Sequence, residues 1–298
     1  MKTSIFYYTN NLLPPNLLKN TLNATVDHAI RNNCELIITS HYPLVKNYIS
    51  QPLTNGENYT SIVDPITREA SKSKLYDHIV SGNILETDYP VKNYVVGKLP
   101  YNFTSIIWQI LLSLNKCSHN DVIFMESDCF YPKNYVEVTK NKLTHLDMTY
   151  CFNTTCFLGI NGFYKLRPTV FLSTFSGKRE VFRRIFERKL NLSTNGAKFV
   201  LEPIVDTMDN YQDFIKQDPL TTNCSFLSEC DLDGPILDVR HRFNLANAYS
   251  VSSDNYFPKH YYWGEAQKYI DMLGDSDIDA TDAIDSKLWH HGLANLNY

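Results

Sequence analysis

The first 40 residues carry apolar positions in a strand–helix–strand pattern. An aromatic-rich run at 4–9 predicts a strand, and apolar residues at helical spacing predict a helix that is capped by Asn16 and ends near Asn32. A second apolar run at 34–40 predicts another strand. Two strands joined by a helix within so short a stretch predict a parallel sheet with right-handed crossovers.

The pattern continues as far as residue 132. A strand is expected at 91–97 and a helix at 105–115, and the polar stretch before them offers one helix at 68–81. The next strand is Val122–Met125, whose apolar residues are typical of a strand that is buried on both faces. We therefore expect the α/β class, with a mixed sheet flanked by helices.

An acidic turn follows this strand directly. Glu126 and Asp128 lie one residue apart, and Pro132 prevents the strand from simply continuing. Open α/β sheets bind their ligands at the carboxyl ends of the strands. Two hard oxygen ligands at that position suit a divalent cation that carries phosphate. The alternative is a solvated acidic turn without a ligand, and the motif by itself does not separate the two.

Beyond Pro132 the pattern is less regular. Strands are expected at 149–157 and 164–175, followed by a helix at 176–189. Six basic residues lie between Lys178 and Lys189, which favours either a solvated face or a surface that meets a polyanion. A short strand at 236–239 then leads into His241, a residue type that donates to phosphate, ligates metals or stays at the surface.

The composition narrows the class of protein. The chain has 298 residues, of which 43% are hydrophobic, enough for one large α/β domain or two packed lobes. Its apolar runs fall short of the ~20 residues of a membrane span, and its start lacks a signal-peptide pattern. The seven cysteines lack the C-x-x-C spacing of a zinc site, so we expect reduced, buried thiols. These features predict a cytoplasmic protein (in the host cytoplasm if it is viral), and the net charge of −4 gives no global attraction for nucleic acid.

The order of these segments resembles the GT-A class of glycosyltransferases. The resemblance runs from about residue 4 to 270 and depends mainly on two motifs, Glu126-Ser-Asp128-x-x-Tyr131-Pro132 and Asp238-x-Arg240-His241-x-x-Asn244. They are similar to an E-x-D-x-x-Y/H-P turn and a D-x-R-H-x-x-N segment in a group of bacterial and phage proteins. The first carboxylate here is Glu126, where the usual D-x-D motif has aspartate.

The resemblance implies a nucleotide-sugar donor, expected to be a UDP-sugar, with Mn2+ or Mg2+ on its diphosphate. Asp128 would bind the metal, Glu126 would contact the metal, its waters or the donor ribose, and His241 would complete the metal shell. Thr9 and Asn10 would contact the nucleotide. Arg240 and Arg242 would stabilise the charge of the diphosphate leaving group.

An inverting enzyme also needs a general base near the acceptor hydroxyl, and Glu202 and Asp206 are the candidates. The acceptor is expected to be a hydroxymethylated pyrimidine of phage DNA, bound through the basic helix Lys178–Lys189, or alternatively a cell-surface polysaccharide. The implied organisation is a single GT-A-like domain at 1–270, divided into a nucleotide-sugar-binding half at 1–132 and an acceptor-side half at 133–270. A tail at 271–298 follows.

Two other classes of protein remain open. A metal-dependent nuclease or nucleotidyltransferase also places carboxylates at strand ends, but it would need further acidic ligands on neighbouring strands. A non-catalytic nucleotide-sugar-binding protein would bind the donor without transferring the sugar.

Overall fold

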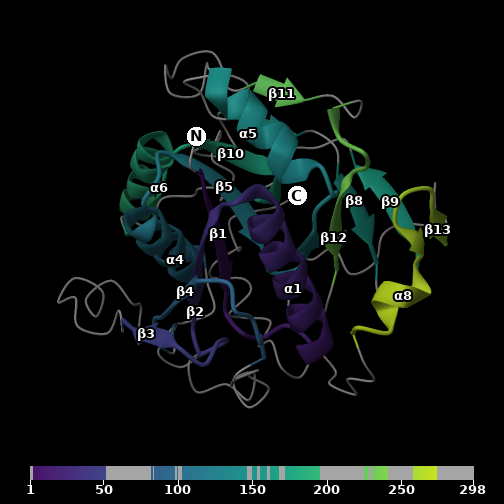
Figure 1. Ribbon diagram of the computed structural model, residues 1–298, viewed down its shortest axis with the longest axis horizontal. Helices are drawn as coiled ribbons and strands as arrows, with labels where there is room; N and C mark the ends of the chain where they lie inside the picture. Colours follow the sequence, from purple (N-terminus) through teal and green to yellow (C-terminus); the bar gives the residue numbers. More distant parts are fainter. Residues whose placement is uncertain are drawn as a thin grey trace.

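The computed structural model describes residues 3–51, 82, 84–97, 99, 103–145, 150–152, 155–159, 162–167, 172–194, 225–227, 231–240 and 258–273. Within them the chain forms a mixed α/β structure with a mostly parallel central sheet between helices (Figure 1). The elements, in chain order, are β1 (Thr3–Thr9), α1 (Pro15–Asn32), β2 (Glu35–Ser40), β3 (Tyr48–Ser50), β4 (Val91–Val95), α4 (Phe103–Lys116), β5 (Asp121–Glu126), β6 (Cys129–Phe130), α5 (Tyr135–His145), β7 (Tyr150–Phe152), β8 (Thr155–Leu158), β9 (Tyr164–Arg167), η3 (Leu172–Thr174), β10 (Phe175–Lys178), α6 (Arg179–Thr194), β11 (Ser225–Leu227), β12 (Ile236–Val239), β13 (Lys259–His260), β14 (Gly264–Glu265) and α8 (Gln267–Ile270).

The central sheet has the strand order β11-β7-β10-β5-β1-β2-β4-β3 among the described residues. β1 pairs in parallel with both β2 and β5, β2 pairs in parallel with β4, and β4 pairs in parallel with β3. β10 is antiparallel to both β5 and β7, which makes the sheet mixed. The expected α/β class with a mixed sheet flanked by helices is therefore confirmed.

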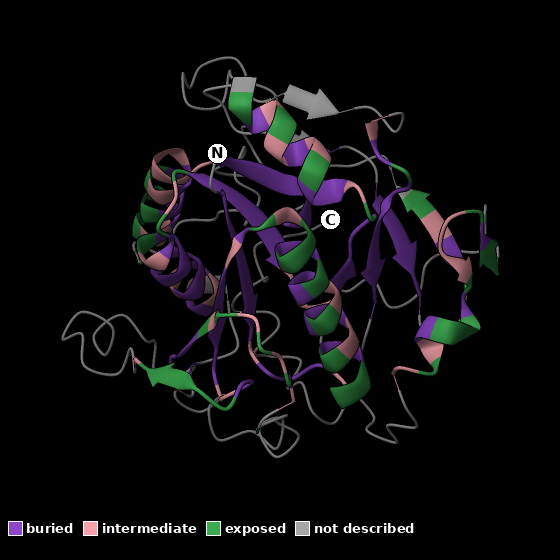
Figure 2. Cartoon of the chain, viewed as in Figure 1, coloured by how far each residue is buried: buried purple, intermediate pink, exposed green. Residues whose placement is uncertain are grey.

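Successive side chains of the central strands enter two separate cores. Ile5 and Tyr7 of β1 pack in one core with residues of α1 and α5, whereas Phe6 and Tyr8 pack in the other with residues of α4 and α6. The same alternation holds along β5, because side chains in a strand point to opposite faces of the sheet. Figure 2 shows the consequence: the central strands are buried, while the helices expose their outer faces. This two-sided burial explains why Val122–Met125 is continuously apolar.

A second sheet, of order β6-β12-β8-β9, lies beside the first. β12 runs antiparallel to β6 and parallel to β8. β6 follows β5 after only two residues, Ser127 and Asp128. The acidic turn is thus the point at which the chain leaves the large sheet and enters the smaller one.

Helix α1 begins two residues earlier than the sequence pattern indicated. Its cap position is Pro14, without a side-chain cap, and Pro15 occupies the first turn, where its fixed φ suits a helix and its missing N–H is not needed. Asn16 therefore lies inside the helix and the expectation that it is the cap was wrong. The helix ends at Asn32, and its cap residue Asn33 adopts a left-handed conformation with φ of 49°.

Three other local expectations need correction. The stretch 149–157 contains two strands, β7 and β8, which belong to different sheets. The stretch 164–175 is divided between β9, η3 and the start of β10. Residues 176–178, expected to begin a helix, belong instead to β10, where they pair with residues 121–123 of β5, and α6 begins at Arg179. The expected helix at 68–81 and the expected tail at 271–298 lie largely or wholly outside the described residues.

Two features bear on the expectations from composition. Within the described residues, Cys34, Cys117, Cys129 and Cys156 are free and buried, as the sequence predicted for the cysteines. Among the described helices, none is both long enough and apolar enough to cross a membrane.

Candidate functional site

The acidic turn lies at the switch point of the central sheet. From β1 the chain builds the sheet outward through β2 and β4 on one side, and it returns to place β5 on the other side. β1 and β5 are parallel neighbours, and Tyr8 is the register partner of Glu126. Their carboxyl ends therefore open at one edge of the sheet, which is where open α/β folds bind ligands.

Glu126 is held by the tyrosines on either side of it. The Tyr8 hydroxyl donates a short hydrogen bond to Glu126 Oε1. The Glu126 backbone N–H donates to the Tyr131 hydroxyl oxygen at 2.9 Å. Because Tyr8 is buried in the sheet and Tyr131 follows the turn, these bonds fix both the carboxylate and the end of β5.

The turn itself is fixed by contacts from α1 and β12. Thr21 Oγ1 lies 2.7 Å from the Ser127 carbonyl oxygen. The Val239 backbone N–H donates to the Asp128 carbonyl oxygen at 3.0 Å. The backbone of this turn is therefore tied to the first helix and to a strand more than a hundred positions away in the sequence.

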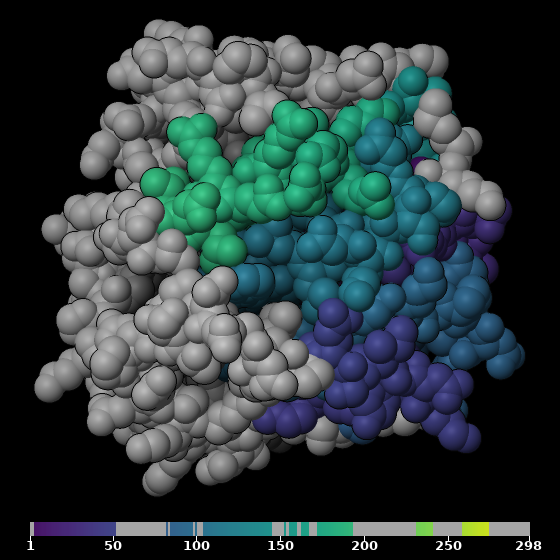
Figure 3. Space-filling view, turned by 90° about the vertical axis from the view of Figure 1, so that its left-hand side faces the viewer, coloured from purple at the N-terminus to yellow at the C-terminus, as the bar shows by residue number. Residues whose placement is uncertain are grey.

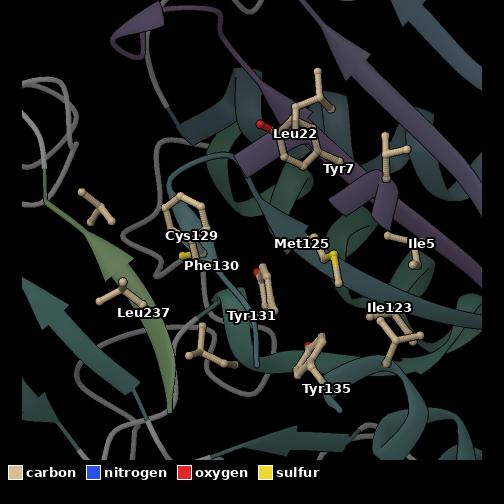
Figure 4. Close-up of a cluster of buried hydrophobic side chains, with 14 of the residues drawn as sticks. Ile5, Tyr7, Leu22, Ile123, Met125, Cys129, Phe130, Tyr131, Tyr135 and Leu237 are labelled. Atoms are coloured by element: carbon tan, nitrogen blue, oxygen red, sulfur yellow. The ribbon is translucent and has the colours of Figure 1, made fainter. Parts of the chain in front are cut away.

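Three possible ligand atoms gather at the turn. One ligand atom each from Glu126, Asp128 and Cys129 lie within 4.8 Å of one another. The Cys129 thiol donates to Asp128 Oδ1 at 3.5 Å, and its side chain is buried. Figure 4 shows Cys129 and Phe130 in the core beside Leu237 of β12, with Met125 of β5 nearby. The side chains of Glu126 and Asp128, by contrast, are of intermediate exposure.

The smaller sheet adds a third carboxylate and a cation. Asp238 is the antiparallel register partner of Cys129 and the parallel partner of Phe157. Arg240 Nη2 lies 2.8 Å from Asp238 Oδ2, and the guanidinium carbon lies 3.9 Å from the centre of the Phe157 ring. Both side chains are buried, with 6% of Asp238 and 7% of Arg240 exposed. A buried ion pair thus flanks the acidic turn.

Mutual repulsion and burial shift the titration of these groups. Burial raises the pKa of Glu126, and the charges of Asp128 and Asp238 raise it further, against the Tyr8 hydrogen bond and the Arg240 charge. Burial also raises the pKa of Asp238, although Arg240 opposes the rise. The pKa of the Cys129 thiol is raised well above its usual value by burial and by the three carboxylates. Such a site favours a bound positive charge.

Thr9 and Asn10, expected to contact a nucleotide, lie next to this edge at the end of β1. The Asn11 backbone N–H donates to Thr9 Oγ1 at 3.1 Å, and the Leu12 N–H donates to Asn10 Oδ1 at 3.0 Å. Asn11 then joins this loop to the one after β2, because its Oδ1 accepts hydrogen bonds from the backbone N–H groups of His41 and Tyr42 at 3.0 and 3.2 Å. The two loops that border the switch point therefore form one unit.

The structure brings together Glu126, Asp128 and Arg240 of the expected site. Glu202, Asp206, His241 and Arg242 lie outside the described residues, so their expected roles remain predictions. Sequence reasoning assigned no role to Tyr8, Cys129 or Asp238. Asp238 was visible as the first residue of the D-x-R-H segment, but only the pairing of β12 with β6 reveals that it adjoins the acidic turn.

The basic stretch 178–189 is largely occupied by contacts within the protein. Lys178 Nζ lies 2.7 Å from Asp121 Oδ1, and Arg179 donates a short hydrogen bond to the Cys117 carbonyl. Arg183 forms ion pairs at 2.7 Å with Glu180 and Glu187 of its own helix, and Lys189 is fully buried. Figure 3 shows the green segment that contains α6 at the surface beside α4. Its charges give no specific support to a surface that faces DNA.

Comparisons with known proteins give limited guidance. No protein-family model matches the sequence, and no curated protein matches it significantly. Among solved structures, S. aureus TarS 1–349 in complex with UDP-GlcNAc is similar with a TM-score of 0.40 and 13% identity, over 99% of this chain and 73% of that one. The 4-diphosphocytidyl-2C-methyl-D-erythritol synthase of Anaerococcus prevotii is similar with a TM-score of 0.39 and 11% identity, over 76% and 88%. Likenesses of this size assign neither a fold nor a function to this chain.

Proposed function

We propose that this protein is a metal-dependent glycosyltransferase of the GT-A type, which takes a sugar from a nucleoside-diphosphate donor. The observation that carries the proposal is the acidic turn at the switch point between β1 and β5, with Glu126 fixed by Tyr8 and with Arg240 close by. A nucleoside diphosphate needs a cation for its phosphates and a strand-end crevice for its nucleoside. This edge of the sheet offers residues suited to both.

The residues at the turn fit a hard divalent cation. Glu126 and Asp128 provide carboxylate oxygens, which suit Mn2+ or Mg2+. The buried Cys129 thiol donates to Asp128 Oδ1, so the oxygen atoms of the two carboxylates are the ligands proposed here. When bound, the cation would neutralise the charge that develops on the diphosphate leaving group.

The chain's own residues have the following proposed roles. Glu126 and Asp128 would hold the cation, and Arg240 would meet a diphosphate oxygen. The loop of Thr9 and Asn10 would border the nucleoside, for which uridine is the proposed base. His241 and Arg242 are proposed to add to the metal shell and the phosphate contacts, and Glu202 or Asp206 to act as the base of an inverting reaction.

Binding of the donor is the first test. Thermal unfolding with a panel of nucleoside diphosphates should show that UDP with Mn2+ raises the melting temperature more than either alone. Stabilisation by a ligand grows as RT ln(1 + [L]/Kd), about 2.7 kcal/mol at a hundredfold excess over Kd. Asp128→Asn should abolish the contribution of Mn2+. If no nucleoside diphosphate stabilises the protein with or without metal, the proposal is refuted.

The acceptor is the second question. The proposed acceptors are a hydroxymethylated pyrimidine in phage DNA and a cell-surface polysaccharide, and the engaged charges of the basic stretch 178–189 do not favour the first. Transfer of labelled sugar to hydroxymethylated DNA, compared with unmodified DNA and with polysaccharide, distinguishes them. Transfer to neither, together with donor binding and no hydrolysis, would indicate a non-catalytic nucleotide-sugar-binding protein.

A nucleotidyltransferase is a second candidate because a third carboxylate, Asp238, adjoins the turn. Two-metal phosphoryl chemistry uses such additional ligands. The two reactions differ in their products. A glycosyltransferase releases a nucleoside diphosphate from a nucleotide sugar, whereas a nucleotidyltransferase releases pyrophosphate from a nucleoside triphosphate. Chromatography of the products with each substrate decides between them.

A further inference from the structure

The buried ion pair beside the acidic turn is incompletely bonded. Arg240 Nη2 and Asp238 Oδ2 are 2.8 Å apart, but Asp238 Oδ1 and Arg240 Nε, both buried, have no hydrogen-bond partner among the described atoms. Buried carboxylate and guanidinium groups usually complete their hydrogen bonds, and each often forms a bidentate pair with its partner. An acceptor and a donor are therefore both left for a ligand.

The register places Asp238 against the turn. Its backbone partner is Cys129, and the Asp128 carbonyl oxygen accepts the N–H of the next residue, Val239. The electrostatic influence is mutual: the Asp238 charge acts on Glu126, and the Asp128 charge acts on Asp238. The third carboxylate therefore belongs to the same electrostatic unit as the two in the turn.

The charges of this unit indicate what it would bind. When all three carboxylates are ionised, Glu126, Asp128 and Asp238 contribute −3 and Arg240 contributes +1, which leaves a formal charge of −2 on these described residues. A divalent cation cancels that charge. It also shares with Arg240 the neutralisation of Asp238, so that the guanidinium can contact an anion as well. A ligand that has both a divalent cation and an anionic oxygen, such as a metal diphosphate, satisfies the unpaired acceptor and the unpaired donor together.

Arg240 is well placed for such an exchange. Its backbone N–H donates to the Leu158 carbonyl oxygen at 2.8 Å, so the residue is fixed to β8. Its guanidinium also rests on the Phe157 ring at 3.9 Å. The backbone and the aromatic face hold the side chain in place, and only the bond to Asp238 needs to change.

We propose that Asp238 is a third carboxylate of the cation site and that Arg240 serves as its counter-ion until a divalent cation replaces it. This inference rests on the proposed function for the identity of the anion, a nucleoside diphosphate, but not for the cation. Asp238 lies in a different sheet from Glu126, so the cation site would draw its ligands from both sheets.

The test is the binding of Mn2+ alone, measured by calorimetry and by the electron paramagnetic resonance signal of free Mn2+. Asp238→Asn keeps the shape of the side chain and an oxygen for Arg240, and it should weaken Mn2+ binding by about tenfold or more. Asp233→Asn is the matched control. It removes the same charge from an exposed position before β12 and should leave Mn2+ affinity unchanged.

Replacement of the counter-ion should have the opposite effect. Arg240→Met removes the competing positive charge, so Mn2+ should bind more tightly, by roughly threefold or more, while UDP should bind more weakly in the presence of Mn2+. Arg240→Lys keeps the charge and should not tighten Mn2+ binding. Far-ultraviolet circular dichroism tests whether each variant is folded. If Arg240→Met does not fold, the Mn2+ affinities of Asp238→Asn and Arg240→Lys decide.

Each outcome bears on one claim. If Asp238→Asn binds Mn2+ as the wild type does, Asp238 is not a ligand, whatever the protein's activity. If Arg240→Met weakens Mn2+ binding, the counter-ion assignment is overturned. If the Mn2+ results are as expected but no nucleoside diphosphate binds, the cation site stands and the glycosyltransferase proposal fails.

Discussion

Glu35 at the start of β2 offers a quantitative test of what holds the central sheet together. Its Oε2 accepts hydrogen bonds from Ser4 Oγ at 2.6 Å and from the Ser118 backbone N–H at 2.7 Å. Its Oε1 lies 2.7 Å from both Lys92 Nζ and Ser118 Oγ. One carboxylate thus joins β1, β2, β4 and the connection from α4 to β5, at the end of the sheet opposite the candidate site.

The contribution of Glu35 to the free energy of unfolding follows from its pKa. Burial alone would raise the pKa of Glu35, but the hydrogen bonds from Lys92, Ser4 and Ser118 outweigh it and lower the pKa from 4.5 to about 2. Each pKa unit corresponds to about 1.4 kcal/mol, so the upper limit is about 3 kcal/mol. Lys92 is half-exposed, and solvent screening reduces its share. We therefore expect Glu35→Gln to lower the free energy of unfolding by about 2 kcal/mol at pH 7.

The direction of the pKa shift determines how the stabilisation by Glu35 depends on pH. A depressed carboxylate pKa stabilises the folded state fully above the unfolded value of 4.5, and this stabilisation is lost as the pH falls toward about 2. The difference between the wild type and Glu35→Gln should therefore be constant from pH 7 to about pH 5. This difference in the free energy of unfolding should shrink by about half at pH 3. Urea unfolding followed by circular dichroism at each pH measures it.

Glu180 provides the control. Its pKa is also lowered to about 2, chiefly by hydrogen bonds from Arg183, but it lies at the surface of α6. Exposed ion pairs contribute little to stability, so Glu180→Gln should change the free energy of unfolding far less than Glu35→Gln. Equal losses in the two variants, or a Glu35→Gln effect that persists undiminished at pH 3, would refute the reasoning.

Three further substitutions have defined outcomes. Tyr8→Phe removes the hydrogen bond that orients Glu126, and calorimetry should show Mn2+ binding weakened by about tenfold with the fold intact. Asn11→Ala removes the buried amide that joins the loops after β1 and β2, at a position with φ of 62°, and should cost about 2 to 4 kcal/mol in urea unfolding; unchanged stability would contradict this account. Gly234→Ala would place a Cβ 2.5 Å from the Tyr262 ring and should cost about 1 to 3 kcal/mol in the same assay, and a neutral result would show that the ring can move aside.

The strands that sequence patterns predicted well are those that are buried along nearly their whole length. β1, β2, β5 and β12 appear in the sequence as short apolar runs with clear ends, because all their side chains except Glu35 and Glu126 are buried. Helix α5 was missed because little of it is apolar: Tyr135, Val136 and Leu143 face the core, and the residues between are mostly polar. Its start also follows closely on Pro132, which suggests an irregular loop.

Other elements depend on contacts that no local pattern contains. The local sequence of residues 176–178 does not identify a strand, and their pairing with β5 and β7 makes them one. The two-residue strand β6 is too short to show any periodicity.

The residues of the candidate site also differ in how far the sequence predicts them. Glu126 and Asp128 were recognisable because they are close in sequence and follow an apolar strand. Asp238 reaches them only through the pairing of β12 with β6, and Tyr8 reaches Glu126 only through the pairing of β1 with β5. Such partners are set by tertiary structure, so a single sequence conveys their residue types but not their proximity.

The two-residue turn between β5 and β6 has a consequence for folding. Tyr8 and Glu126 come together as soon as the large sheet forms, but Asp238 joins them only when the smaller sheet has docked. A partly folded molecule with an intact large sheet would therefore have the switch point but only part of the acidic unit. The complete site is a property of the assembled molecule, and it exists only while the two sheets remain in register with each other.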